Sequence, residues 1–398
     1  MPKLSADDIA NLHEGTRLAV AGRHPDEAFG FVNPPVYRGS TVLHPTTRDL
    51  LDHTNRYAYG RRGSPTSTAL REAVGAIEGG AGVVLCPSGL NAVSTALLSC
   101  LSAGDHLLVT DSAYDPIRAF CDNTLTRFGI EVSYYDPLAG ADIARLFRPN
   151  TRAVFTESPG SLTFEIQDIP AIAEAAHARD IAVLLDNTWA TPLYFPAHAR
   201  GADISIWSGT KYLSGHSDVM FGTVSANARY WRALQKAHGY LGLYVSPDDV
   251  YLALRGLRTL GIRLEAHQKS ALEIARWLET RPEVSRVLHP ALESHPGHAL
   301  WKRDFLGASG LFSIILKPMP QKAVEAFLDH LSFFGIGYSW GGFESLAIPF
   351  NAAPDRTATK WQPEGPAIRL QIGLEDVRDL RRDLEQGLAR LNAAAAEA

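Results

Sequence analysis

Five short apolar runs that alternate with helix-length segments constrain the fold of this chain more than any other feature. The runs are rich in Val, Leu and Ile and occupy residues 82–86, 106–111, 153–158, 181–188 and 204–208. Segments at about 89–102, 114–128 and 168–179 separate them and are long enough for helices. Buried strands that alternate with helices are typical of a mostly parallel sheet with helices on both faces. We therefore expect a doubly wound α/β domain.

The segments on either side of this pattern predict two further units. The first sixty residues contain much Pro, Gly, Arg and His with little periodicity, which predicts an extended arm over residues 1–62. The sheet domain then covers 63–257. A long helical stretch from about 247 to 280 crosses the end of this domain. Short apolar runs at 310–316 and 367–373 and a last helix with an apolar stripe follow it, and they predict a smaller α+β domain over 258–398.

Composition excludes several classes of function. The chain has 398 residues, of which 45% are hydrophobic and 20% charged, as in an ordinary globular protein. A net charge of -5 argues against a nucleic-acid surface, and no apolar run approaches the length of a membrane span. Three cysteines without CxxC spacing argue against disulfides and zinc. We expect a cytoplasmic protein with no nucleic-acid or membrane partner and no metal, in which His289, His295 and His298 belong to a polar surface loop.

Chemically equipped residues follow three of the predicted strands. Ligands of open α/β sheets bind at the carboxyl ends of the strands. Asp186 comes at the end of one apolar run, and Lys211 follows another together with the hydroxyls of Ser208 and Thr210. Gly89 opens a predicted helix, where free backbone N–H groups suit a phosphate. Taken singly, each feature has a simpler explanation as a helix cap, a turn residue or a solvent-facing lysine.

Together these residues match the three groups by which proteins hold pyridoxal 5'-phosphate (PLP). A PLP site needs a cradle for the phosphate, an aspartate for the ring nitrogen and a lysine that binds the aldehyde. A lysine in that role needs an amine of lowered pKa, which burial near other positive groups provides. The order and placement of Gly89, Asp186 and Lys211 therefore predict a PLP enzyme.

Several motifs carry a family resemblance that covers nearly the whole chain. They are "YGRRGSPT", "DSAYDP", "ESPGS", "SGTKYLSGHSDVMFGT", "YSWGGFESL" and "IRLQIGLEDV". With them the chain resembles the Cys/Met-metabolism family of PLP enzymes. The resemblance implies PLP fold type I, the fold of aspartate aminotransferase. It also implies a homotetramer of two tight dimers in which the partner subunit completes each active site.

The resemblance implies a role for each matching residue. Lys211 would bind the cofactor and move protons, Asp186 would pair with the ring nitrogen, and Tyr114 would stack on the ring. The phosphate would be held by the backbone of Gly89 and Leu90, by Ser208 and Thr210, and by Tyr59 and Arg61 of the neighbouring subunit. The substrate would contact Tyr59, Ser339, Trp340 and Arg369. Arg369 alternates with apolar neighbours on its predicted strand, although a solvent-facing arginine would alternate in the same way.

Within the family the chain most resembles the bacterial cystathionine β-lyases. The γ-synthases, γ-lyases and methionine γ-lyases of the family, here called the γ-branch, usually have leucine where this chain has Trp340. Residues 157–166 also lack the Pro-x-Asn-Pro ending of that branch. Residues 64–66 (Ser-Pro-Thr) lean toward the γ-branch, and Phe343 replaces the tyrosine usual in β-lyases. The expected reaction is β-elimination of L-cystathionine to homocysteine, pyruvate and ammonia. The alternatives are a γ-lyase, γ-synthase or methionine γ-lyase activity, or a PLP-fold protein without turnover.

Overall fold

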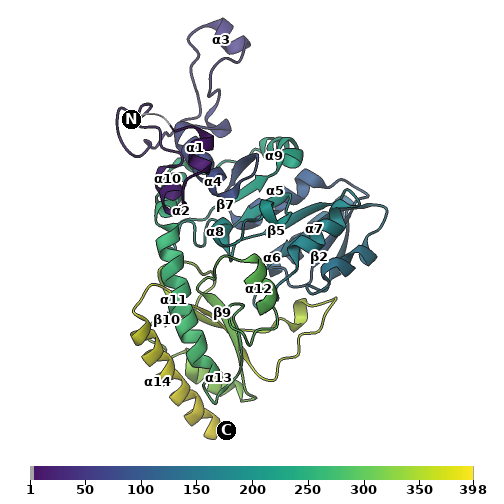
Figure 1. Cartoon of the computed structure of the whole chain (residues 1–398), viewed down its shortest axis with the longest axis vertical. Coiled ribbons are helices and arrows are strands. Elements are labelled where there is room, and N and C mark those ends of the chain that lie inside the picture. The colour runs from purple at the N-terminus through teal and green to yellow at the C-terminus, as the bar shows by residue number, and fades with distance from the viewer. Residues whose placement is uncertain (1–3, 398) are drawn as a thin grey trace.

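The computed structural model describes residues 4–397, which contain a seven-stranded and a five-stranded sheet (Figure 1). The larger sheet has the order β1-β7-β6-β5-β4-β2-β3. Its strands are β1 (Gly82–Cys86), β2 (His106–Thr110), β3 (Glu131–Tyr135), β4 (Thr151–Glu157), β5 (Ala182–Asp186), β6 (Ile204–Trp207) and β7 (Gly222–Ala226). The smaller sheet has the order β10-β11-β12-β9-β8, with β8 (Val284–Leu288), β9 (Leu311–Leu316), β10 (Phe334–Gly335), β11 (Ser345–Phe350) and β12 (Ala367–Gln371).

The larger sheet is parallel except for one strand. β7 runs antiparallel to both β1 and β6, whereas β2, β3, β4, β5 and β6 pair in parallel. All five predicted apolar runs form strands of this sheet, and their side chains are almost entirely buried. The expected doubly wound α/β sheet is confirmed. Its parallel topology places the carboxyl ends of β2, β4, β5 and β6 along one edge.

Helices cover the two sheets and connect their strands (Figure 1). Beside the larger sheet lie α4 (Pro65–Glu78), α5 (Gly89–Cys100), α6 (Asp115–Phe120), α7 (Ile169–His177), α8 (Thr191–Tyr194), α9 (Ala228–Tyr240) and α10 (Pro247–Arg258). The later helices are α11 (Leu260–Glu279), α12 (His298–Asp304), α13 (Gln321–Leu328) and α14 (Val377–Ala396). The capping of α4 follows from its sequence, since Ser64 accepts from the N–H of Ser67, Pro65 is the first helical residue, and Gly79 ends the helix at φ 73°.

The early part of the expected N-terminal arm is helical rather than extended. The described part contains α1 (Ala6–Ala10), α2 (Glu14–Val20) and α3 (Thr47–Leu51); residues 1–3 lie outside the described residues. Leu18 and Ala21 are buried against α4 and α10, and Arg258 donates hydrogen bonds to both of their carbonyls. The segment around α3 does extend away from the rest of the chain (Figure 1). Only this later part, therefore, lacks a core of its own.

The smaller sheet contains more strands than the sequence pattern predicts. The expected runs at 310–316 and 367–373 form β9 and β12, and β8, β10 and β11 are additional. The helical stretch from 247 to 280 is broken at Thr259 into α10 and α11. The apolar stripe of α14 packs into the core of this sheet through Leu380, Leu384, Leu388 and Leu391. The domain boundaries at 62 and 257 stay a prediction.

The three histidines of the 289–298 segment do not form the surface loop that we expected. His289 is fully buried and His295 is 5% exposed. Their ring nitrogens accept hydrogen bonds from the backbone N–H groups of Ala291 and Gly297, and His298 bonds the carbonyl of Pro290. The imidazoles of His289 and His295 thus each satisfy one backbone N–H of their own segment. Among residues 4–397, no helix is both long and apolar enough to cross a membrane.

Candidate active site

Lys211 lies four residues beyond the end of β6, at the edge where the parallel strands end. Its Nζ donates to Ser339 Oγ at 2.6 Å and is 5.4 Å from the ring centroid of Trp340. Burial and, to a smaller extent, the nearby Arg369 lower the pKa of Lys211 to about 8, while Asp186 acts in the opposite direction. A lower pKa leaves more of the amine unprotonated at neutral pH, which is its nucleophilic form.

Asp186 ends β5, the strand next to β6. Its carboxylate accepts the N–H of Thr188 at 3.0 Å. Burial raises the pKa of Asp186, and this rise exceeds the opposing effects of Thr188 and Lys211. A partly buried carboxylate whose negative charge is incompletely compensated is suited to a cationic ligand group at this place.

Ser339 lies between β10 and β11 of the smaller sheet and contacts both Lys211 and Arg369. Its hydroxyl accepts from Lys211, and its carbonyl accepts from Arg369 Nη2 at 2.9 Å. Ser339 has a φ of 76°, a left-handed conformation that is costly for a residue other than glycine and is often found at functional sites. Arg369 lies in β12 and is 9% exposed, so the alternation read from the sequence does not place it in open solvent.

Tyr114 caps the N-terminus of α6 and is about half exposed. Its backbone N–H donates to Glu157 Oε2 at 2.8 Å. Burial raises the pKa of Tyr114, as do the carboxylates of Glu157 and Asp186, whereas Arg369 lowers it. These mutual effects place the predicted residues Tyr114, Asp186, Arg369 and Lys211 in one electrostatic environment.

The N-terminus of α5 lies close to Ser208, the residue that follows β6. Ser88 Oγ accepts the N–H of Asn91 at 3.1 Å, and the N–H groups of Gly89 and Leu90 at the first two helical positions have no acceptor within the helix. A Cβ at position 89 would lie 2.4 Å from Ser208 Oγ, so only glycine leaves this space open. The geometry fits a small anion held by two N–H groups and the Ser208 hydroxyl.

Thr210 lies nearby, but its hydroxyl is engaged elsewhere. It donates to the carbonyl of Phe221 at 3.1 Å and accepts the N–H of Phe221 at 2.9 Å. These two bonds anchor the segment that enters β7. The predicted role of Thr210 in binding a phosphate stays a prediction.

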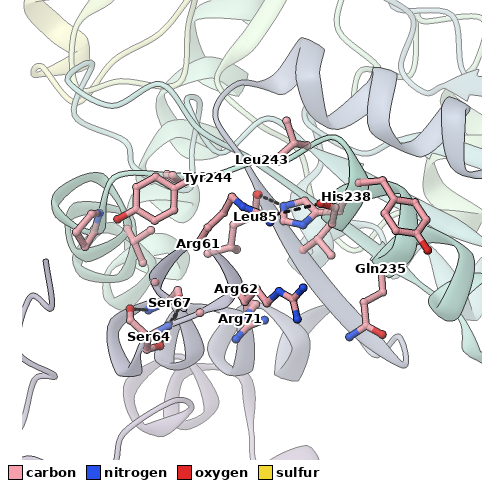
Figure 2. A pocket seen from close by; sticks show the side chains of 18 of the residues that line it. Arg61, Arg62, Ser64, Ser67, Arg71, Leu85, Gln235, His238, Leu243 and Tyr244 are labelled. Carbon is pink, nitrogen blue, oxygen red and sulfur yellow. Dashed lines mark hydrogen bonds between the residues drawn. The ribbon is translucent and has the colours of Figure 1, made fainter. Parts of the chain in front are cut away.

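Tyr59 and Arg61 lie apart from this group within the same chain. Arg61 belongs to a 3-10 turn at Gly60–Arg62, and its Nη1 donates to the carbonyl of Gly239 at 3.1 Å. Figure 2 shows it in a cavity of about 390 Å³ with Arg62, Arg71 and His238. Of the described residues, those lining this cavity do not include Lys211, Asp186, Tyr114 or Arg369. Tyr59 is 46% exposed and forms a bridge with Thr41.

Sequence reasoning missed two residues that shape the site. Glu157 ends β4 in register with Asp186, and Thr188 joins two predicted residues because it also accepts the N–H of Ser208 at 2.9 Å. The carboxyl-end rule that identified Asp186 applies equally to Glu157, so that signal was present. Nothing in the local pattern marks Thr188.

Comparison with known proteins assigns the chain to a family. The profile described as "Cys/Met metabolism PLP-dependent enzyme" matches residues 15–389. The chain belongs to this family. A protein of Rhizobium johnstonii is 56% identical over 389 residues, which cover 97% of this chain and 98% of that protein. The cystathionine β-lyase of Salmonella typhimurium is 46% identical over 387 residues, 94% of this chain and 98% of that enzyme.

A solved structure of a second family member confirms PLP fold type I. The cystathionine γ-synthase of Xanthomonas oryzae pv. oryzae, in complex with aminoacrylate and cysteine, superposes with a TM-score of 0.88 at 33% identity. The match covers 96% of this chain and 99% of that structure. As a family member the chain is a PLP-dependent enzyme, and the anion cradle at Gly89, the partly buried Asp186 and the low-pKa Lys211 fit this cofactor.

Proposed function

We propose that this enzyme cleaves the Cβ–S bond of L-cystathionine by β-elimination. The observation that carries the proposal is the desolvated Lys211 amine, held between Ser339 and Trp340 and within the electrostatic reach of Asp186 and Arg369. The choice of β- over γ-elimination is supported by 46% identity to a protein named cystathionine β-lyase, against 33% to one named cystathionine γ-synthase.

PLP, when bound, stabilises the electron pair that remains at the substrate's Cα after deprotonation. The backbone of Gly89 and Leu90 and the hydroxyl of Ser208 would hold its phosphate. Asp186 would keep a proton on the ring nitrogen of PLP. The positive charge of that protonated nitrogen would in turn compensate the negative charge of the Asp186 carboxylate. Tyr114 would cover one ring face from the start of α6.

The chain's own residues account for substrate positioning and proton movement. Arg369 would bind the substrate α-carboxylate through its guanidinium, whose orientation the Ser339 carbonyl sets. The Lys211 amine would take the Cα proton, and Lys211 or Tyr114 would protonate the sulfur that leaves from Cβ. Addition of one water to the remaining three-carbon fragment gives pyruvate and ammonia. One cystathionine and one water thus yield homocysteine, pyruvate and ammonia.

The keto acid produced from L-cystathionine tests this function. The purified holoenzyme should release pyruvate, because β-elimination leaves the three-carbon part of the substrate as the keto acid. Coupled reduction by lactate dehydrogenase together with mass spectrometry identifies the product. Release of 2-oxobutyrate would instead assign the chain to γ-elimination, and absence of any keto acid with bound cofactor would favour a protein without turnover.

We further propose that two chains share each active site within a homotetramer in the cytoplasm. The chain between α2 and α4 exposes large apolar side chains, among them Phe29 (93%), Phe31 (72%) and Leu43 (85%), and its part around α3 extends from the body of the chain (Figure 1). Apolar side chains in an extended segment are stabilised by covering a second surface. Tyr59 and Arg61 follow this segment, which would bring them to the cofactor phosphate of the neighbouring chain.

Complementation between two inactive variants tests the shared site. Lys211→Ala and Arg61→Ala proteins should each be strongly impaired, because each damages every site of its own dimers. After co-refolding, half of the dimers are mixed and contain one intact site out of two, so roughly a quarter of all sites should regain wild-type activity. If mixed dimers form without any gain in activity, Arg61 does not serve the partner's site.

A further inference from the structure

The connection between β11 and β12, residues 351–366, reaches back from the smaller sheet to the larger one. It contacts Asp111, the residue that directly follows β2 at the carboxyl edge of the larger sheet. Asp111 is 1% exposed. Its carboxylate therefore depends on the protein for hydrogen-bond donors.

Three consecutive residues of the connection supply those donors. Asp111 Oδ1 accepts the N–H of Thr357 at 3.0 Å and its hydroxyl at 3.2 Å. Asp111 Oδ2 accepts the N–H of Ala358 at 3.1 Å, and the N–H and hydroxyl of Thr359 at 2.8 and 2.7 Å. Burial alone would raise the pKa of Asp111, but these donors more than offset it and the pKa lies below its usual value. The carboxylate is thus held in its charged form.

Arg118 closes the arrangement from α6. It donates to Asp111 Oδ1 at 3.1 Å through Nη1 and to Thr357 Oγ1 at 3.1 Å through Nη2. Its guanidinium lies 3.7 Å from the ring centroid of Tyr134, and only 5% of its surface is exposed. The cation therefore joins both sides of the contact and has little freedom to leave it.

Two residues of the proposed active site lie close in sequence to this contact, Tyr114 at the start of α6 and Arg369 in β12. Tyr114 follows Asp111 by three residues, and Arg369 follows Thr359 by ten residues on the same β11–β12 connection and strand. The hydrogen bonds of Asp111 thus join the segment that leads to Tyr114 to the segment that leads to Arg369, and each of these two side chains shifts the pKa of the other. We propose that Asp111 is a positioning residue that latches residues 357–359 to the larger sheet and so sets Tyr114 against Arg369.

This inference rests on the proposed function for its kinetic consequence but not for the latch itself. Asp111→Asn replaces one acceptor oxygen by an NH₂ group, which would face the N–H donors of the connection. If the Asp111–Arg118 pair were purely structural, Asp111→Asn would lower the stability of the fold and leave the active site unchanged. A latch would additionally loosen residues 357–359 and displace Tyr114, and a displacement of about 1 Å can cost on the order of 10²-fold in rate.

Hydrogen exchange, visible circular dichroism and kinetics of the holoenzyme test the latch together. In Asp111→Asn we expect faster amide exchange at 357–359, a weaker cofactor dichroism band because Tyr114 has moved, and a fall in kcat/KM of about 10²-fold. The matched control is Asp383→Asn, since Asp383 is a buried acid that accepts backbone N–H groups of Ser332 and Phe333. Asp383→Asn should lower stability but leave the amide exchange at 357–359, the cofactor dichroism and kcat/KM as in the wild type.

A second variant covers the case in which Asp111→Asn does not fold. The double change Thr357→Val and Thr359→Val removes two hydroxyl donors but keeps the shape of the side chains and the Asp111–Arg118 pair. The same three changes, in weaker form, are expected. Unchanged dichroism and kinetics in a folded variant, whatever its exchange rates, would overturn the proposal. Failure of the wild type to release pyruvate would count against the proposed function instead, because exchange at 357–359 is read independently of turnover.

Discussion

Lys211→Ala is expected to lower kcat for cystathionine cleavage by about 10⁴-fold or more, because one amine both binds the cofactor and moves the Cα proton. Its desolvated position, with a pKa of about 8 and the Ser339 hydroxyl as hydrogen-bond partner, gives the amine both abilities. Steady-state kinetics with cystathionine and the visible spectrum of the reconstituted variant measure the effect.

The matched control is Lys322→Ala, which removes an exposed lysine from α13. It should behave as the wild type. A Lys211→Ala protein that keeps a tenth or more of the wild-type kcat would remove this lysine from the chemistry.

Arg369→Ala should lower kcat/KM by roughly 30-fold to 5,000-fold. This range corresponds to the loss of about 2–5 kcal/mol that follows when one partner of a buried charge pair is truncated. The cofactor's absorbance should stay normal, because Arg369 contacts the Ser339 carbonyl and the proposed substrate carboxylate rather than the residues that would hold PLP.

Arg378→Ala provides the comparison for Arg369→Ala. The Arg378 side chain is 84% exposed and pairs with Asp376 at the start of α14, so its loss should leave the kinetics unchanged. If Arg369→Ala and Arg378→Ala give the same kcat/KM, Arg369 does not bind the substrate.

The larger sheet and the centre of the site could be predicted from the sequence because their signals are local. Apolar runs of five to eight residues with helices between them determine a parallel sheet. Its topology then brings Asp186 and Lys211 to one edge, although they are 25 positions apart in the sequence. β10 and β11 could not be predicted in this way, since β10 has two residues and β11 contains Pro349.

Contacts between distant segments leave no local pattern. Asp111 and Thr357 are 246 positions apart, and neither sequence environment indicates the other. The packing of the early helices also depends on distant segments. Leu18 and Ala21 pack in one core cluster with α4, and their carbonyls accept hydrogen bonds from Arg258, whereas the arm itself has no periodic apolar face. His289 and His295 differ in this respect, since the N–H groups that they accept lie only two residues further along the same turn.

Mapping the lysine that carries the cofactor tests the central claim most directly. The holoenzyme would be reduced with borohydride, which fixes the cofactor to the amine that binds it, and its peptides would be analysed by mass spectrometry. We expect the cofactor mass on the peptide that contains Lys211, with loss of the visible absorption band. Attachment to a different lysine, or no cofactor on any peptide after reconstitution with PLP, would contradict the account.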